Sequence, residues 1–174
     1  MARIDFVTGA PEKYMSLVQE LTLVPSRIET IVGGHAARDL QSTPEGEWSA
    51  ARVLAHMISY ARHNGDFIRL IAWMTSPERQ SWDEDDEISR EGLATKNSAA
   101  LLEALSAAIA ETIELLSHTP DAQWGRPGTV PGYGYRSLRQ QLRAHIDHLN
   151  DHATQLEDLL SRPPPSPTVH QPLQ

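Results

Sequence analysis

The sequence predicts an all-α protein built as a four-helix bundle. Four long segments carry apolar residues at the three- and four-residue spacing of a helix that buries one face. Polar or Gly/Pro-rich segments separate them, and no clear alternating strand pattern is present. The predicted helices span residues 11–32, 50–75, 97–117 and 137–162. We expect residues 1–160 to form one bundle domain and the proline-rich residues 161–174 to form a disordered tail.

Composition narrows the function classes. The chain has 174 residues, a formal net charge of −8 at pH 7 and no cysteine. The negative charge argues against nucleic acid as a partner, and the lack of cysteine excludes disulfides, thiolate ligands and a cysteine nucleophile. No apolar run approaches the roughly 18 residues of a membrane span, and the N-terminus does not resemble a signal segment. We therefore expect a cytoplasmic protein that does not bind membranes.

The first two predicted helices differ in what fills their apolar faces. Helix 11–32 has a purely apolar stripe, in which Pro25 predicts a kink or a split. Helix 50–75, for which Ser49 is the expected N-cap, carries His56 and His63 within its inner face. We expect Trp48, just before this helix, to pack against the end of the bundle.

The third predicted helix and the two connections are less informative. Residues 97–117 are alanine-rich, with Asn97 or Ser98 as the cap. Residues 76–96 read as a polar linker, and its acidic run 83–87 is expected to be a solvated loop rather than a second cation site. The Gly/Pro-rich residues 119–136 are either an ordinary long loop or a segment that arches over one end of the bundle and shapes a pocket mouth.

The fourth predicted helix contains the strongest functional signal. Ser137 and Gln140 are spaced as a capping box. The apolar seam that follows includes two histidines: Leu138, Leu142, His145, Leu149, His152, Leu156 and Leu159. His148 lies beside this seam. Because His148 and His152 are four residues apart, their rings project from one side of the helix and can converge on a metal ion. His145 and His152 are separated by roughly 10 Å along the axis, too far to share an ion readily.

Two histidines make only half of a metal site, so a third ligand must come from elsewhere. His56 and His63 are the best candidates, and spacing does not choose between them. His35, in a connection, and His118, at a helix end, are weaker candidates.

Two stretches resemble the DinB family of DinB/YfiT-like metalloenzymes. Residues 46–57 resemble the family's Trp-Ser…His start of the second helix, and residues 148–155 resemble its His-x-x-x-His-x-x-Gln motif. The resemblance covers about residues 11–160. It implies a four-helix bundle of unusual connectivity, often dimeric, with a divalent metal on His56, His148 and His152. Related members use a thiol cofactor, as bacillithiol transferases and mycothiol-dependent maleylpyruvate isomerases do.

These ligands predict chemistry on a small molecule. Three nitrogens leave coordination positions open, as a catalytic site requires. We therefore expect an enzyme dependent on zinc, nickel or iron, either a transferase that uses a low-molecular-weight thiol or a hydrolase. The alternative is a non-catalytic binding or stress-response module in which the metal only stabilises the bundle. Further residues considered near this site, as ligand partners or as a base, are His63, His145, Gln155, Glu20, Asp66 and Asp151.

Overall fold

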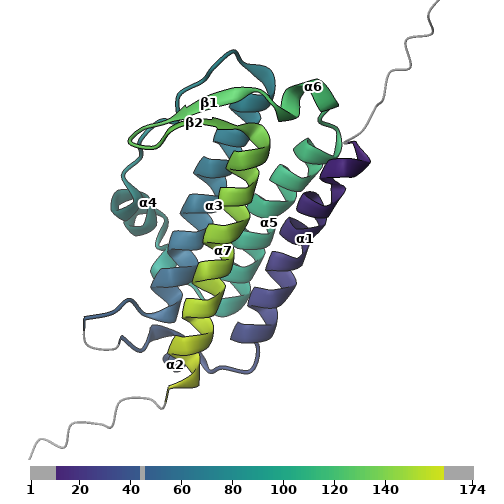
Figure 1. Cartoon of the computed structure of the whole chain (residues 1–174). Helices are drawn as coiled ribbons and strands as arrows, with labels where there is room; N and C mark the ends of the chain where they lie inside the picture. The colour runs from purple at the N-terminus through teal and green to yellow at the C-terminus, as the bar shows by residue number, and fades with distance from the viewer. Residues whose placement is uncertain (1–10, 44–45, 163–174) are drawn as a thin grey trace, which may run out of the picture.

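Four long helices form the body of the protein in the computed structural model, which describes residues 11–43 and 46–162 (Figure 1). They are α1 (Glu12–Val32), α3 (Ala50–Trp73), α5 (Ser98–Ser117) and α7 (Leu138–Ser161). Both α1 and α3 pack against α5 and α7, so α1 and α3 lie across the bundle from each other. The predicted fold class is confirmed, and each predicted helix boundary lies within two residues of the observed one.

Short elements occupy the connections. They are α2 (Ala37–Gln41), α4 (Glu84–Glu91), the 3-10 helix η1 (Leu93–Thr95), α6 (Asp121–Trp124), and the strands β1 (Pro127–Val130) and β2 (Gly134–Ser137). Within the described residues, no helix has the length and hydropathy needed to cross a membrane. The predicted tail falls mainly on residues 163–174, which lie outside the described part of the chain, whereas Ser161 is still helical.

Side-chain caps fix where the long helices begin. Ser49 Oγ accepts a hydrogen bond from the Arg52 amide at 3.2 Å, which starts α3 as predicted. The predicted capping box of α7 is also present: the Ser137 amide donates to Gln140 Oε1 at 2.9 Å, and the Gln140 amide donates to Ser137 Oγ at 3.3 Å. These caps fix the first residues of the two helices that carry His56, His148 and His152.

Pro25 does not split α1, contrary to one of the two expectations for it. The helix runs without interruption from Glu12 to Val32. On either side of the proline, Leu21, Val24 and Ile28 are buried in the core. Burial of these side chains, at about 1.5–3 kcal/mol each, outweighs the lost backbone hydrogen bond and the ring clash.

The expectation of a solvated acidic loop at residues 83–87 is wrong. These residues begin α4, which Asp83 caps by accepting a hydrogen bond from the Asp86 amide at 2.9 Å. Acidic side chains in a first helical turn are favoured by the helix dipole. Glu87 is buried, and Gly92 ends the helix with a positive φ of 60°. The supposed linker is therefore a structured element packed on α3.

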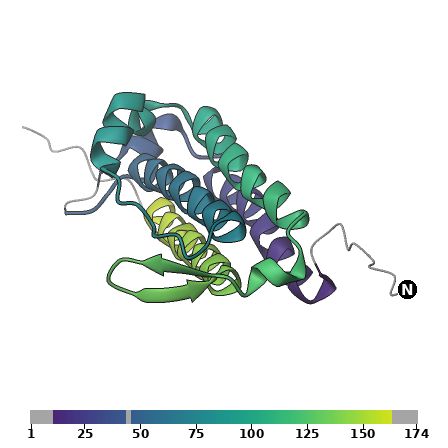
Figure 2. The same ribbon diagram turned by 90° about the horizontal axis from the view of Figure 1, so that it is seen from above.

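A β-hairpin replaces the predicted irregular segment before α7. β1 and β2 pair antiparallel, and in Figures 1 and 2 they cross the outside of the bundle beside α7. A Cβ on Gly128 would lie 2.6 Å from Ile71 Cγ1, so only glycine allows the hairpin to approach α3 this closely. The hairpin therefore lies against the side of α3 and α7 instead of arching over the end of the bundle, and the expectation of a segment without strands was wrong.

Candidate metal centre

The three histidines with the family-motif spacing meet between α3 and α7. His56 comes from α3, and His148 and His152 come from α7. One ring nitrogen from each residue lies within 4.8 Å of the other two. The Nε2 atoms of His56 and His148 are 3.0 Å apart. All three side chains are half-buried, which gives a cluster that is shielded by the bundle and still reachable from solvent.

A carboxylate orients His56. Nδ1 of His56 lies 2.7 Å from Oε2 of Glu84, the first residue of α4. Because an ionised carboxylate only accepts hydrogen bonds, Nδ1 carries the proton and the lone pair of Nε2 faces the cluster. Arg52 donates to the other Glu84 oxygen at 3.2 Å and to Asp85 at 2.6 Å.

Residues of α7 and α3 contact the rings of His152 and His148. Nδ1 of His152 lies 2.7 Å from Gln155 Oε1, and the amide oxygen can only accept, so Nε2 of His152 is also free of a proton. Gln155 therefore binds a histidine directly, and does not fill a gap in the core. The Tyr60 ring packs on the His148 ring, with centroids 3.8 Å apart.

The cluster favours neutral imidazoles. Burial, together with the neighbouring His152 and His56, lowers the pKa of His148 to about 4. Burial is also the main cause that lowers the pKa of His152, although its bond to Gln155 acts in the opposite direction. At pH 7 these two rings keep unprotonated nitrogens, which is the form that binds metal ions.

His63 belongs to a separate network that attaches α4 to α3. Its Nε2 lies 2.8 Å from Glu87 Oε2, which also accepts a hydrogen bond from Ser59 Oγ at 2.8 Å. Trp82 stacks on the His63 ring, with centroids 4.6 Å apart. Burial alone would raise the pKa of Glu87, but the bonds from Ser59 and His63 lower it below its usual value. This network holds α4 in place, and with it Glu84.

His145 is sealed inside the bundle. Its side chain is 0% exposed, and its Nδ1 accepts a hydrogen bond from Asn64 Nδ2 at 2.8 Å. Gln141 in turn donates to Asn64 Oδ1 at 2.6 Å. Burial lowers the pKa of His145 to about 3. These contacts support the structural interpretation of His145.

None of the carboxylates considered from sequence joins the cluster, and neither do the two weaker histidine candidates. Glu20 pairs with Arg143, Asp66 with Arg69, and His118 is exposed at the end of α5. Asp151 and His35 are also outside the group of three. Glu84, which the sequence did not single out, is the carboxylate that contacts a cluster histidine.

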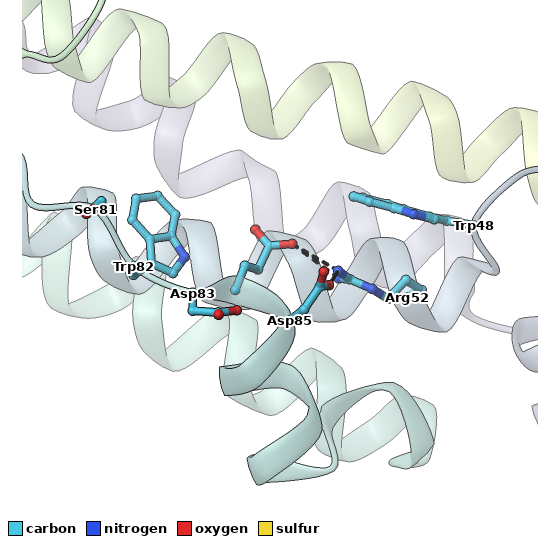
Figure 3. Close-up of a pocket in the computed structure, with 7 residues that line it drawn as sticks. Trp48, Arg52, Ser81, Trp82, Asp83 and Asp85 are labelled. Atoms are coloured by element: carbon cyan, nitrogen blue, oxygen red, sulfur yellow. Dashed lines mark hydrogen bonds and ion pairs between the residues drawn. The ribbon is translucent and has the colours of Figure 1, made fainter.

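Two cavities adjoin Glu84. One of about 560 Å3 is lined by Trp48, Arg52, Ser81, Trp82, Asp83, Glu84 and Asp85, with Trp48 and Trp82 at opposite ends (Figure 3). A second, of about 280 Å3, is lined by Arg79, Gln80, Ser81, Trp82, Glu84 and Pro131. The histidine rings do not line either cavity, but Trp48 lies beside His56, with ring centroids 5.4 Å apart. Trp48 is thus a cavity wall.

Comparison with known proteins assigns the chain to a family. No curated protein matches it. A solved structure, described as YfiT from Bacillus subtilis, a probable metal-dependent hydrolase with an unusual four-helix bundle topology, is similar with a TM-score of 0.76. The identity is 19%, over 91% of this chain and 90% of that one, which shows a shared fold. The sequence profile of the DinB superfamily matches residues 20–156. The chain therefore belongs to the DinB superfamily.

Proposed function

We propose that this protein is a metal-dependent enzyme that acts on a small molecule, with His56, His148 and His152 as the ligands of one divalent ion. The observation that carries the proposal is the convergence of three ring nitrogens from two helices within 4.8 Å. Within the described residues, no carboxylate or fourth histidine joins this group. A structural zinc site usually has four protein ligands, so three ligands beside a cavity favour a catalytic site.

The residues fit a divalent ion such as zinc, nickel or iron. The 3.0 Å between the Nε2 atoms of His56 and His148 is slightly below the separation of about 3.3 Å for two nitrogens on a tetrahedral zinc ion. Glu84 and Gln155 each accept the proton of a cluster histidine at 2.7 Å. This is the outer-shell arrangement that directs metal-ligating imidazoles and increases their basicity.

The reaction that this site supports best is attack by water or by a small thiol on an electrophilic substrate. A divalent ion held by these three imidazoles would act as a Lewis acid, which would lower the pKa of water or of a thiol and polarise a carbonyl group. The chain itself keeps the rings neutral and oriented, while the cavity between Trp48 and Trp82 gives room for a substrate or cosubstrate. The description of YfiT as a probable metal-dependent hydrolase supports the water reaction.

Metal analysis and a substrate screen test this proposal together. The purified chain is stripped with a chelator, reloaded separately with zinc, nickel or ferrous iron, and assayed for bound metal. Each loaded form is then screened with esters and amides, and with electrophiles in the presence of low-molecular-weight thiols. We expect one ion per chain and turnover that disappears on chelation. Full metal loading that raises the melting temperature without any turnover would instead support the non-catalytic module.

A further inference from the structure

We propose that Arg79 and Arg136 form a carboxylate-recognition site beside the histidine cluster, so that the small substrate or thiol cosubstrate carries a carboxylate group. This inference rests on the proposed metal-dependent function and adds the chemical class of the ligand.

Strand pairing places both arginines on the same face. Gly128 and Val130 of β1 are buried toward the bundle, whereas Thr129 between them is only half-buried. Arg136 of β2 is the partner of Gly128, and paired residues project to the same side of a sheet. Arg136 therefore shares the face that is turned toward the bundle.

Arg79 lies on the same face, in the segment that pairs with the other side of β1. Glu78 forms a parallel bridge with Thr129, so the residues on either side of Glu78 project to the opposite face, the face of Gly128 and Val130. Pro77 is accordingly buried and Arg79 half-buried. Two backbone hydrogen bonds fix this segment: the Arg79 amide to Thr129 O at 2.9 Å, and the Thr129 amide to Pro77 O at 2.8 Å.

The Arg79 guanidinium lies beside a residue that contacts the histidine cluster. Arg79 lines the 280 Å3 cavity together with Glu84, whose carboxylate contacts His56. The Arg136 guanidinium lies 5.2 Å from the centre of the Tyr133 ring, in the turn of the same hairpin.

Neither arginine has a carboxylate counter-ion among the described residues, although the chain carries a net charge of −8. Most other half-buried guanidinium groups are paired, including that of Arg52 with Glu84 and Asp85. Glu84 lines the same cavity as Arg79, but its two oxygens already accept from Arg52 and His56. The Arg79 guanidinium instead lies 5.7 Å from the centre of the Trp82 ring.

An unpaired guanidinium in a small cavity suits a planar carboxylate. Its fork of N–H donors can bind both carboxylate oxygens, and the Trp82 ring and Pro131 provide apolar walls for the rest of a small ligand. Asp83, Asp85 and Glu84 lie along the adjoining cavity and repel a dianionic phosphate more strongly than a monoanion. A ligand of this kind can place its carboxylate at the arginines while its reacting group reaches the cluster.

A matched pair of thiols tests the inference. 3-Mercaptopropionate and 3-mercaptopropionamide have nearly the same shape and differ in the charge of one end. Their affinities are measured on the cobalt-loaded chain, in which a thiol bound at the metal changes the visible spectrum, and on the metal-free chain by calorimetry. We expect the carboxylate to bind about 10- to 100-fold more tightly, as hydrogen bonds to a charged group predict. The preference should weaken as salt is added.

Three variants test whether the two arginines cause the preference for the carboxylate. Arg79→Gln combined with Arg136→Gln should abolish it without changing the metal stoichiometry, and Arg79→Lys should retain part of it, because lysine keeps the charge but loses the fork. Arg139→Gln is the control, since Arg139 is exposed and lines the groove between α1 and α7. Equal affinity for the two thiols in the unchanged chain, or a preference that survives in the double variant, overturns the inference. If the unchanged chain binds no metal ion but still prefers the thiol with a carboxylate, only the proposed metal function is refuted.

Discussion

Glu84 accepts a hydrogen bond from Nδ1 of His56 at 2.7 Å across 28 residues of sequence. The contact exists because α4 packs on α3, where Glu87 binds Ser59 and His63 one turn beyond Glu84. The acidic run that begins α4 therefore serves two purposes on one helix face. Glu87, which is buried, attaches α4 to α3, and Glu84, which is half-buried, orients His56.

Glu84→Ala should weaken metal binding about 10- to 100-fold, the usual effect of removing the outer partner of a ligating histidine. Glu84→Gln should have a smaller effect, because an amide oxygen can still accept from Nδ1. Asp85→Ala is the matched control: Asp85 also binds Arg52 but does not contact His56. Chelator competition at fixed pH measures the affinities. Equal losses for Glu84→Ala and Asp85→Ala would mean that Glu84 acts through general charge and not through His56.

Alanine substitutions of single histidines should separate ligands from structural residues. Stoichiometric metal binding should be abolished by His56→Ala, by His148→Ala and by His152→Ala, because each leaves only two ring nitrogens to bind the ion. His63→Ala should retain the metal, since its ring binds Glu87 outside the cluster.

His35→Ala, which removes another histidine outside the cluster, is the control for this series. Metal content is measured after dialysis against a weak chelator, with circular dichroism to confirm that each variant is folded. Loss of the metal from His63→Ala, together with its retention in His56→Ala, would show that the ligand assignment is wrong.

The sequence predicted the elements that local periodicity determines. Apolar spacing located the four long helices, and the four-residue step between His148 and His152 follows from helix geometry alone. The choice between His56 and His63 depends on how α3 is rotated against α7, which single-helix spacing does not contain. The family motif favoured His56, and the structure brings His56 to the other two rings.

Glu84 and the hairpin were missed for related reasons. An acidic run gives the same sequence signal whether it is solvated or packed, and the packing of α4 depends on its contacts with Ser59 and His63. The strands are four residues each, too short for an alternating pattern to be distinguished from a loop. What fixes the hairpin is its close approach to α3 at Gly128, a tertiary contact.

We expect the protein to form a homodimer through the outer face of α5. This face exposes the small residues Ala99, Ala107 and Ala110, which allow a close approach of a second helix. Light scattering at tens of micromolar should give twice the chain mass of 19.3 kDa. Ala107→Glu should shift the mass toward the monomer, whereas Ala122→Glu, on the exposed surface of α6, should not. A monomeric mass for the unchanged chain would contradict this expectation.

The stability of the metal-free protein should fall below pH 6.5. His145 has a pKa of about 3 in the folded protein and 6.5 in the unfolded chain, so between these values only the unfolded chain takes up the proton. The contribution of His145 is therefore fully present above pH 6.5 and is lost progressively as the pH falls. Between pH 7 and pH 5 the free energy of unfolding should decrease by about 2 kcal/mol from this residue alone.

Urea unfolding at constant ionic strength in the presence of a chelator measures this dependence. His145→Gln should lower the stability at pH 7 but flatten the decline, because glutamine does not titrate. The lowered pKa of His148 acts in the same direction and leaves part of the slope in this variant. An unchanged slope in His145→Gln would show that His145 is not the titrating group.

Gly128→Ala should destabilise the protein by about 1–3 kcal/mol, the usual effect of overpacking. The added methyl would lie 2.6 Å from Ile71 Cγ1 and 2.9 Å from Phe67 Cζ, both in α3, so the hairpin must move outward. Gly125→Ala is the control, because its added methyl meets no atom within 4 Å and its φ is −90°. Urea unfolding gives the difference. Because the same hairpin carries Arg136, Gly128→Ala should also reduce the preference for the thiol with a carboxylate. If Gly128→Ala is as stable as Gly125→Ala, the hairpin does not pack tightly against α3.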